Sequence, residues 1–124
     1  MKLYLAGPMR EIPFFNFPAF KAAAAKLRAQ GHYVFNPAER DNEVHGEDIS
    51  TGNAEGCEAK AAIEHGFDLR RALAEDLEFI CKEAEGIALL PGWSNSKGAQ
   101  AEYATALALG LKTFHLREGY EHVK

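Results

Sequence analysis

The sequence has few of the residues that build metal centres and disulfide frameworks. It contains two cysteines, Cys57 and Cys81, among its 124 residues, and they form neither a CxxC pair nor another metal-ligand spacing. Its five histidines show no HxxxH or HExxH spacing. The acidic residues between positions 41 and 48 lack the spacing of an EF-hand loop. We therefore expect two reduced thiols, no bound metal and no other cofactor.

A basic charge excess and a long apolar run are also absent. The chain has 14 Lys and Arg against 18 Asp and Glu, a net charge of −4, whereas a binder of nucleic-acid polymers presents a basic face. No apolar run approaches the ~18 residues of a membrane span. A short strand-like run follows Met1 directly, so we expect no signal peptide. These features predict a cytoplasmic protein whose partners include no nucleic-acid polymer and no membrane.

Short apolar runs alternate with helical patterns along the whole chain. Strands are expected at residues 2–6, 32–36, 86–90 and 111–116, and helices at residues 17–30, 69–84 and 98–109. Strands that alternate with helices form a mostly parallel sheet covered on both faces. The sequence therefore predicts one α/β domain over residues 1–124, a flavodoxin- or Rossmann-like three-layer sandwich with four to five strands.

Local signals set several boundaries of this domain. Asn16 or Phe17 is expected to cap the first long helix ahead of Pro18, Gly31 to end it, and Asp68 to cap the next. Residues 38–67 have no persistent periodicity and predict a long irregular insertion, with a short helix at 58–65. Loops of this length in small domains are usually functional or mobile. Residues 117–124 are expected to form a polar tail.

Residues 89–104 read as the end of a buried strand, a turn rich in Gly, Ser and Asn, and an Ala-rich helix. A strand that leads through a polar loop into a helix N-terminus is a good place to hold an anion. Glu102 lies just inside that helix, and its neighbours on the same face are apolar or small. Because a carboxylate on a packing face is unfavourable unless it is paired or used, Glu102 is a candidate catalytic residue.

A second carboxylate, Asp76, interrupts the apolar stripe of residues 69–80. The helices that carry Asp76 and Glu102 flank the third strand, so one crevice can hold both side chains. Glycosyl chemistry uses such a pair, with one carboxylate at the anomeric carbon and the other handling the proton of the leaving group. The alternative is that each is a buried acid satisfied by backbone N–H groups or an arginine.

Two loops are candidates for binding a phosphate. The turn from Gly7 to Arg10 and the loop from Ser94 through Ser96 to Gly98 face each other if the first and third strands are neighbours. Backbone amides, serine hydroxyls and the arginine then surround an anion. Neither loop is a GxGxxG or Walker motif, and the alternative for each serine is a plain turn or helix cap.

On these residues, the chain resembles the nucleoside 2-deoxyribosyltransferase family, including its 2′-deoxynucleoside 5′-phosphate N-hydrolase members. The matching segments are residues 4–10, residues 75–77 and the strand, loop and helix of residues 87–106. The resemblance implies that Glu102 is the nucleophile and that Asp76 assists the departing base. It also implies that Tyr4 and Gly7 line the sugar pocket. In the phosphate-using members, Arg10 and either Ser94 or Ser96 would hold the 5′-phosphate.

The sequence therefore favours an enzyme that cleaves or transfers the N-glycosidic bond of a 2′-deoxynucleoside or its 5′-monophosphate. The expected partner is a small-molecule nucleoside or nucleotide. One alternative is a non-catalytic nucleotide-binding module of the same fold, and another is a protein–protein scaffold. We expect a homodimer or larger homo-oligomer, because the fourth strand leaves an edge that a small sheet should cover.

Overall fold

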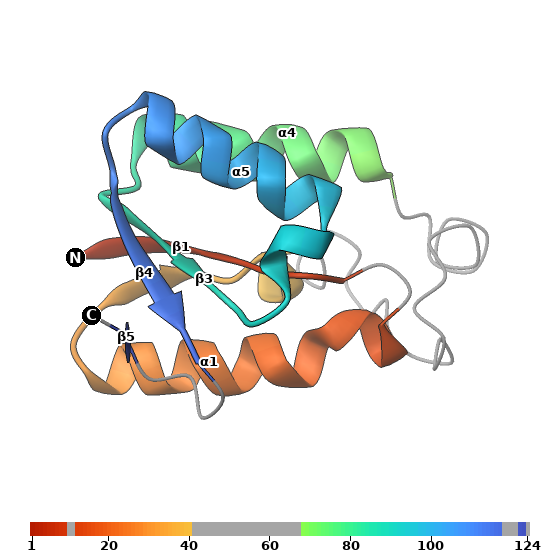
Figure 1. The fold of residues 1–124 in the computed structure, drawn as a ribbon, viewed down its shortest axis with the longest axis horizontal. Coiled ribbons are helices and arrows are strands. Elements are labelled where there is room, and N and C mark those ends of the chain that lie inside the picture. Colours follow the sequence, from red (N-terminus) through yellow and green to blue (C-terminus); the bar gives the residue numbers. More distant parts are fainter. Residues whose placement is uncertain (10–11, 41–67, 118–121, 124) are drawn as a thin grey trace.

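The computed structural model describes residues 1–9, 12–40, 68–117 and 122–123 (Figure 1). In chain order the elements are β1 (Lys2–Ala6), the 3-10 turn η1 (Pro13–Asn16), α1 (Phe17–Ala29), β2 (Tyr33–Phe35), α4 (Leu69–Lys82), β3 (Gly86–Leu89), the 3-10 turn η2 (Trp93–Asn95), α5 (Lys97–Ala108), β4 (Lys112–Leu116) and β5 (His122–Val123). Arg10 lies outside the described residues, as does the predicted insertion from residue 41 onward, including its short helix.

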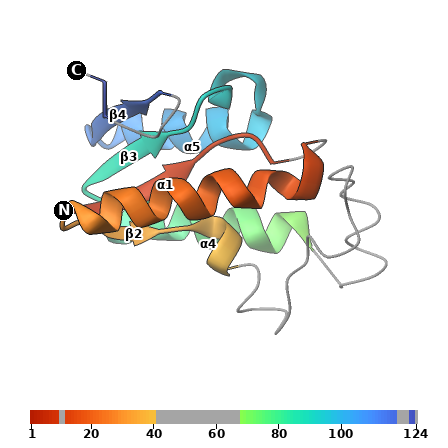
Figure 2. The same cartoon turned by 90° about the horizontal axis from the view of Figure 1, so that it is seen from below.

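The strands form one sheet with the order β2-β1-β3-β4-β5. The first four of these are parallel to one another, and β5 runs antiparallel to β4. α1 lies on one face of the sheet, and α4 and α5 lie on the other (Figures 1 and 2). The predicted three-layer sandwich with a mostly parallel sheet is therefore confirmed. Among the described helices, none has both the length and the apolar character needed to cross a membrane.

The two central strands contribute side chains to both faces of the sheet. In β1, Leu3 and Leu5 pack against the α1 layer, whereas Tyr4 and Ala6 face the α4–α5 layer. β3 alternates in the same way and has no exposed residue. This follows from the two-residue period of a strand, and it explains why these strands read as continuous apolar runs.

Most predicted helix boundaries agree with the structure. The side chain of Asp68 accepts hydrogen bonds from the backbone N–H groups of Arg70 and Arg71, at 3.0 and 3.4 Å. Gly31, just after α1, has a φ of 95°, which an L-residue with a side chain rarely adopts. Asn16 occupies the N-cap position of α1, but its side chain makes no capping hydrogen bond.

The C-terminal region corrects one prediction and the argument built on it. Within the expected polar tail, β5 pairs with β4, and Val123 lies opposite His115. β4 is therefore not an edge of the sheet, so the edge-based argument for an oligomer was wrong. The signal was missed because a two-residue strand is too short to show a period, and an antiparallel neighbour needs only a short connection.

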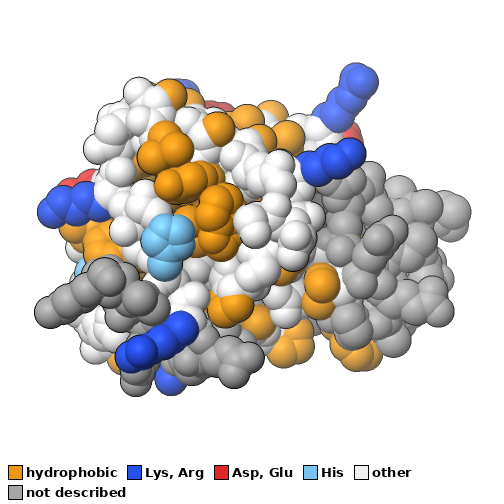
Figure 3. Space-filling view, viewed as in Figure 1, with side chains coloured by type: hydrophobic (Ala, Val, Ile, Leu, Met, Phe, Trp, Pro, Cys, Tyr) orange, Lys and Arg blue, Asp and Glu red, His pale blue; other side chains and the backbone are white. Residues whose placement is uncertain are grey.

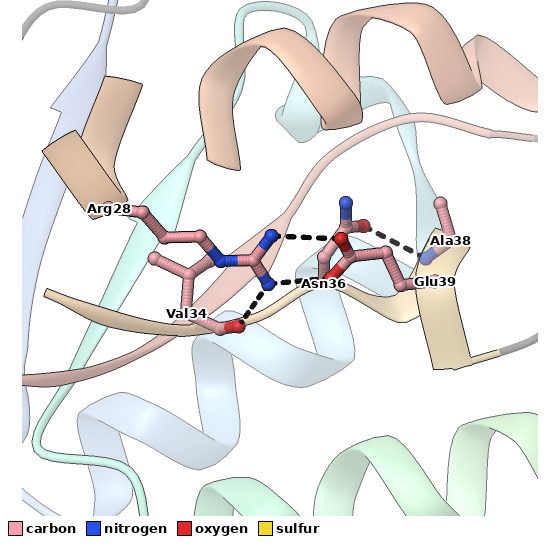
Figure 4. A network of polar contacts seen from close by, with 5 residues as sticks. All are labelled: Arg28, Val34, Asn36, Ala38 and Glu39. Atoms are coloured by element: carbon pink, nitrogen blue, oxygen red, sulfur yellow. Dashed lines mark hydrogen bonds and ion pairs between the residues drawn. The ribbon is translucent and has the colours of Figure 1, made fainter. Parts of the chain in front are cut away.

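The strand β2 forms the other edge of the sheet, and Arg28 covers part of it. The guanidinium group donates to the Val34 carbonyl at 2.9 Å and binds both carboxylate oxygens of Glu39, at 2.6 and 2.8 Å (Figure 4). A charged side chain that covers the backbone of an edge strand discourages pairing with another chain.

Candidate functional site

A cavity lies beside the carboxyl end of β1, between α1, α4 and the N-terminus of α5. Six predicted site residues line it: Tyr4, Gly7, Asp76, Ser96, Gly98 and Glu102. The cavity has about 80 Å³ of room for the centres of water-sized molecules, several times the ~10–15 Å³ that one water needs. Open α/β sheets bind their ligands at this end of the strands.

Three polar side chains converge at the floor of this cavity from three different elements. The hydroxyl of Tyr4 in β1 donates a hydrogen bond of 2.6 Å to Oε2 of Glu102 in α5. Asp76 reaches the same cavity from α4. All three side chains are buried: Tyr4 is 0% exposed, Glu102 is 6% exposed and Asp76 is 8% exposed. The structure therefore brings together the two carboxylates that the sequence predicted would share a crevice.

The protein environment shifts the pKa values of Asp76 and Tyr4. Burial raises the pKa of Asp76 from 3.8 to about 7, although hydrogen bonding with Tyr4 and Glu102 lowers it in part. Burial, together with the negative charges of Glu102 and Asp76, raises the pKa of Tyr4 well above its usual value. Tyr4 therefore keeps its proton as a donor, and Asp76 exchanges its proton near neutral pH, as a general acid should.

The apolar stripe of α4 divides into two parts with different surroundings. Leu69, Ala72 and Leu73 line the cavity and are only partly buried. The buried residues of α4 are Asp76, Phe79 and Ile80. The first turns of the helix therefore form a cavity wall, and only its second half packs into the core.

Of the two candidate serines in the loop between β3 and α5, only Ser96 lies at the cavity. Ser96 lies at the cavity and caps α5, since its Oγ accepts a hydrogen bond of 3.2 Å from the backbone N–H of Ala99. Ser94 is exposed and is not among the residues that line the cavity, and its carbonyl oxygen accepts from the side chain of Gln100. The structure thus places Ser96 and the positive end of the helix dipole at the site.

Gly7 has a packing role in addition to lining the cavity. A Cβ atom at this position would lie 2.7 Å from the Cβ of Leu90 and 2.9 Å from its Cδ1. The chain can therefore leave β1 this close to the end of β3 only without a side chain. This approach brings the loop after β1 to the cavity.

An aromatic wall completes the cavity, and the sequence analysis did not assign it to the site. Phe15, Phe17 and Phe20 line the side formed by η1 and α1. The sequence analysis considered only Phe17, as a possible helix cap, whereas the run of phenylalanines from position 14 to position 20 is the signal for this wall. Phe14, Phe15 and Asn16 have φ values of 54°, 54° and 60°. Consecutive left-handed residues other than glycine are rare, so sequence alone did not indicate this turn.

Asn36 is a buried polar residue that the sequence analysis read only as the end of a strand. Its Oδ1 accepts a hydrogen bond of 3.0 Å from the backbone N–H of Ala38 (Figure 4). Its Nδ2 has no partner among the described residues. It does not line the cavity described above but a separate groove beside the edge strand.

The described part of the chain contains no cluster of three or more His, Cys, Asp or Glu side chains that could hold a metal ion. Within this part of the chain, the polar side chains that line the cavity are the carboxyl groups of Asp76 and Glu102, the phenol of Tyr4 and the hydroxyl of Ser96. The fold and the site define an α/β protein with a small cavity at the carboxyl end of a mostly parallel sheet, in which two carboxyl groups stand among mostly apolar side chains.

Comparison with known families places the chain in one of them. Residues 1–115 match the family described as "Domain of unknown function (DUF4406)", and the protein belongs to this family. No curated protein matches the sequence.

Proposed function

We propose that this protein cleaves or transfers the N-glycosidic bond of a 2′-deoxynucleoside or a 2′-deoxynucleoside 5′-monophosphate. The observation that carries the proposal is the convergence of Asp76 and Glu102 on one cavity, with Tyr4 hydrogen-bonded to Glu102. A pair of carboxyl groups facing one sugar is what cleavage at an anomeric carbon uses. The resemblance to the nucleoside 2-deoxyribosyltransferase family supports the choice of substrate class.

In the proposed first step, a carboxylate oxygen of Glu102 attacks C1′ of the sugar. The bond from C1′ to the base nitrogen breaks, and its electron pair leaves with the base. Asp76, directly or through a water that it orients, gives its proton to the departing base. Tyr4 holds Oε2 of Glu102 through its hydrogen bond and so orients the carboxylate for the attack.

In the second step, a water or a second base attacks C1′ of the glycosyl ester. The ester bond breaks, and Glu102 leaves as a carboxylate. Asp76, now ionised, takes the proton of the attacking group and returns to its starting state. Water as the acceptor gives hydrolysis, and a second base gives transfer.

The N-terminus of α5 favours a phosphorylated substrate. Ser96 lies at the cavity, and although its oxygen caps Ala99, its hydroxyl hydrogen can be donated to an anion. The first turn of a helix also presents backbone N–H groups and a positive dipole end. Arg10 remains a prediction for the same role, because it lies outside the described residues. We therefore favour the 5′-monophosphate as substrate and hydrolysis as the reaction.

A panel assay tests the proposal. The purified protein is incubated with deoxynucleosides and their 5′-monophosphates, and free base is followed by chromatography. We expect the wild type to release base and Glu102→Ala to release none. Glu78→Ala is the matched control, because Glu78 is an exposed acid of α4 whose carboxylate pairs with Lys82 at 3.0 Å. No release by the wild type, or equal release by Glu102→Ala, would falsify the assignment.

The remaining parts of the proposal concern partners and location. We propose a small-molecule nucleoside or nucleotide as the ligand, a cytoplasmic location, and a homodimer or larger homo-oligomer as the working form. The alternative of a non-catalytic nucleotide-binding module predicts thermal stabilisation by the same ligands without their consumption. Measuring melting temperature and free base in the same samples separates the two functions.

A further inference from the structure

Aromatic side chains also pack together away from the cavity wall that η1 and α1 form. Over α5 and β4, where Figure 3 shows hydrophobic side chains beside a histidine, the ring of Trp93 packs on those of Tyr103 and His115. Between β1, β2 and α4, a second group includes Tyr4. Because Tyr4 lines the cavity and bonds Glu102, this second group is in contact with the candidate site itself.

The aromatic group around Tyr4 joins two strands to a helix. Tyr4 of β1 and Phe35 of β2 stand in register, and their rings stack with 5.6 Å between centroids and 23° between planes. Phe79 of α4 stacks on Phe35 at 4.5 Å and lies 6.4 Å from Tyr4. Tyr33, two positions before Phe35, stacks on Phe79 at 6.2 Å. We call these four residues the Tyr4 cluster. Aromatic pairs at such distances stabilise a fold beyond the area that they bury.

The Tyr4 cluster fixes where α4 lies on the sheet. Phe79 packs on aromatic rings of both β1 and β2, so its ring resists sliding of the helix along these strands. Asp76 precedes Phe79 by three residues, on the same face of the helix and about 4.5 Å away along its axis. Both side chains are buried. The stack of Phe35 on Phe79 therefore sets the position from which Asp76 reaches the cavity.

The hydroxyl group of Tyr4 acts on both carboxyl groups of the cavity. It donates a hydrogen bond of 2.6 Å to Glu102. Hydrogen bonding with Tyr4 and with Glu102 also lowers the pKa of Asp76, against the larger effect of burial. Two further charges act on Asp76: that of Glu75 raises its pKa, and that of Arg40 lowers it. Because a hydrogen bond depends steeply on distance and angle, a small rotation of the Tyr4 ring would weaken its contact with both acids.

Phe35 contacts Tyr4 and Phe79 from outside the cavity. Neither phenylalanine is among the described residues that line the cavity, and both line the separate groove beside β2. We propose that Phe35 is a positioning residue of the site: by stacking on Tyr4 and on Phe79, it holds the Tyr4 hydroxyl and Asp76 in place beside Glu102. The consequence for base release rests on the proposed function, whereas the consequence for the titration of Asp76 does not.

Phe35→Leu tests this role, because leucine keeps an apolar side chain but has no ring to stack. We expect kcat for base release to fall about tenfold, since the reacting groups lose their alignment. KM should change by less than about twofold, since no contact with the ligand is lost. Phe35→Tyr keeps the ring and should retain the wild-type kcat. Phe114→Leu is the matched control: Phe114 is also partly buried but packs on the α1 side of the sheet, so this change should lower stability and leave kcat unaltered.

The pH dependence of stability is a second readout and needs no activity. The pKa of Asp76 is higher in the folded state than its ordinary value, so stability falls as pH rises up to the folded pKa. When the Tyr4 hydroxyl no longer reaches Asp76, the ionised form loses a hydrogen bond and this pKa rises further. The fall in stability should therefore end about one pH unit higher in Phe35→Leu than in the wild type. Denaturation curves between about pH 5 and 9 measure this end point, which Phe35→Tyr and Phe114→Leu should leave unchanged.

Three outcomes would overturn the proposal. One is a folded Phe35→Leu with the pH dependence of the wild type, which would show that Phe35 only fills space. Another is a Phe114→Leu that moves the end point as far as Phe35→Leu does, which would attribute the shift to general loss of stability. The third is a Phe35→Leu that raises KM and leaves kcat unaltered, which would place Phe35 in contact with the ligand.

Two further results leave the test decisive. If Phe35→Leu does not fold, Phe35→Met replaces it with the same expectations, because the flexible thioether side chain fills irregular space without a ring. If the wild type releases no base, the proposed function is refuted, and the pH dependence of stability still decides the role of Phe35. The two proposals therefore fail by different measurements.

Discussion

The hydroxyl group of Tyr4 is 2.6 Å from Oε2 of Glu102, and it is the donor in the hydrogen bond between them. The bond links the first strand to the last helix across 98 positions of sequence. Both side chains are buried, and burial raises the pKa of Tyr4 well above its usual value. The phenol therefore stays protonated and holds one oxygen of the carboxylate in a fixed orientation.

Tyr4→Phe removes this donor and keeps the ring that stacks on Phe35, with 5.6 Å between centroids. We expect base release to fall by about 10- to 100-fold and stability to fall by about 1–3 kcal/mol, because Glu102 loses a buried partner. The measurements are kcat and urea denaturation. Tyr33→Phe is the control, since Tyr33 is 60% exposed and stacks on Phe79. Equal effects of the two substitutions would argue against a special role for the Tyr4 hydroxyl.

Asp76 makes stability depend on pH in a direction opposite to that of a salt-bridged acid. Its pKa is raised from 3.8 to about 7 by burial, so between these values the folded state holds a proton that the unfolded state has lost. Stability therefore falls as pH rises from about 4 to about 7, by a few kcal/mol in total. Asp76→Asn should remove this slope and exceed the wild type in stability above pH 7.

Denaturation curves of wild type and Asp76→Asn at several pH values between 4 and 8 test this expectation. Parallel pH profiles for the two proteins would show that Asp76 does not titrate in this range. In the wild type, base release should decline above about pH 7, because Asp76 then lacks the proton for the departing base. Asp76→Asn should release little base at any pH, because it lacks a proton to give to the departing base.

Gly7→Ala should destabilise the fold at the junction of β1 and β3. The added Cβ would lie 2.7 Å from the Cβ of Leu90, so Leu90 or the backbone has to move, at a cost of about 1–3 kcal/mol. Gly98→Ala is the control, because its Cβ would meet only Ser96 Oγ, at 3.9 Å. Thermal melts should show a clear loss for Gly7→Ala and none for Gly98→Ala. A Gly7→Ala melt equal to that of the wild type would disprove the packing argument.

The two serines of the loop before α5 should differ in their effects. Ser96→Ala removes the cap on Ala99, which costs about 1 kcal/mol, and it also removes a hydroxyl from the cavity. We expect a lower melting temperature for Ser96→Ala than for the wild type. We also expect the substitution to raise the KM for monophosphates more than the KM for unphosphorylated nucleosides. Ser94→Ala should change neither quantity, because the Ser94 side chain is not at the cavity. A KM increase that is the same for both substrate types would show that Ser96 does not contact the phosphate.

Local patterns in the sequence were sufficient to predict the layers of the fold and the two buried acids. Asp76 and Glu102 each interrupt an apolar helical face, and both are buried at the cavity. Asp68 was identified as a cap because an N-cap aspartate bonds only its own helix, as it does here. Signals of this kind concern residues within one or two helical turns, so they are visible without the fold.

The partners across the fold were decided by tertiary structure alone. Periodicity showed that Tyr4 lies in a buried strand, but only the strand order and the position of α5 direct its hydroxyl to Glu102. The same holds for the choice of Ser96 over Ser94 and for the pairing of β5 with β4. An amino-acid pattern states which side of an element avoids water. Which distant side chain it meets there depends on how all the elements are stacked.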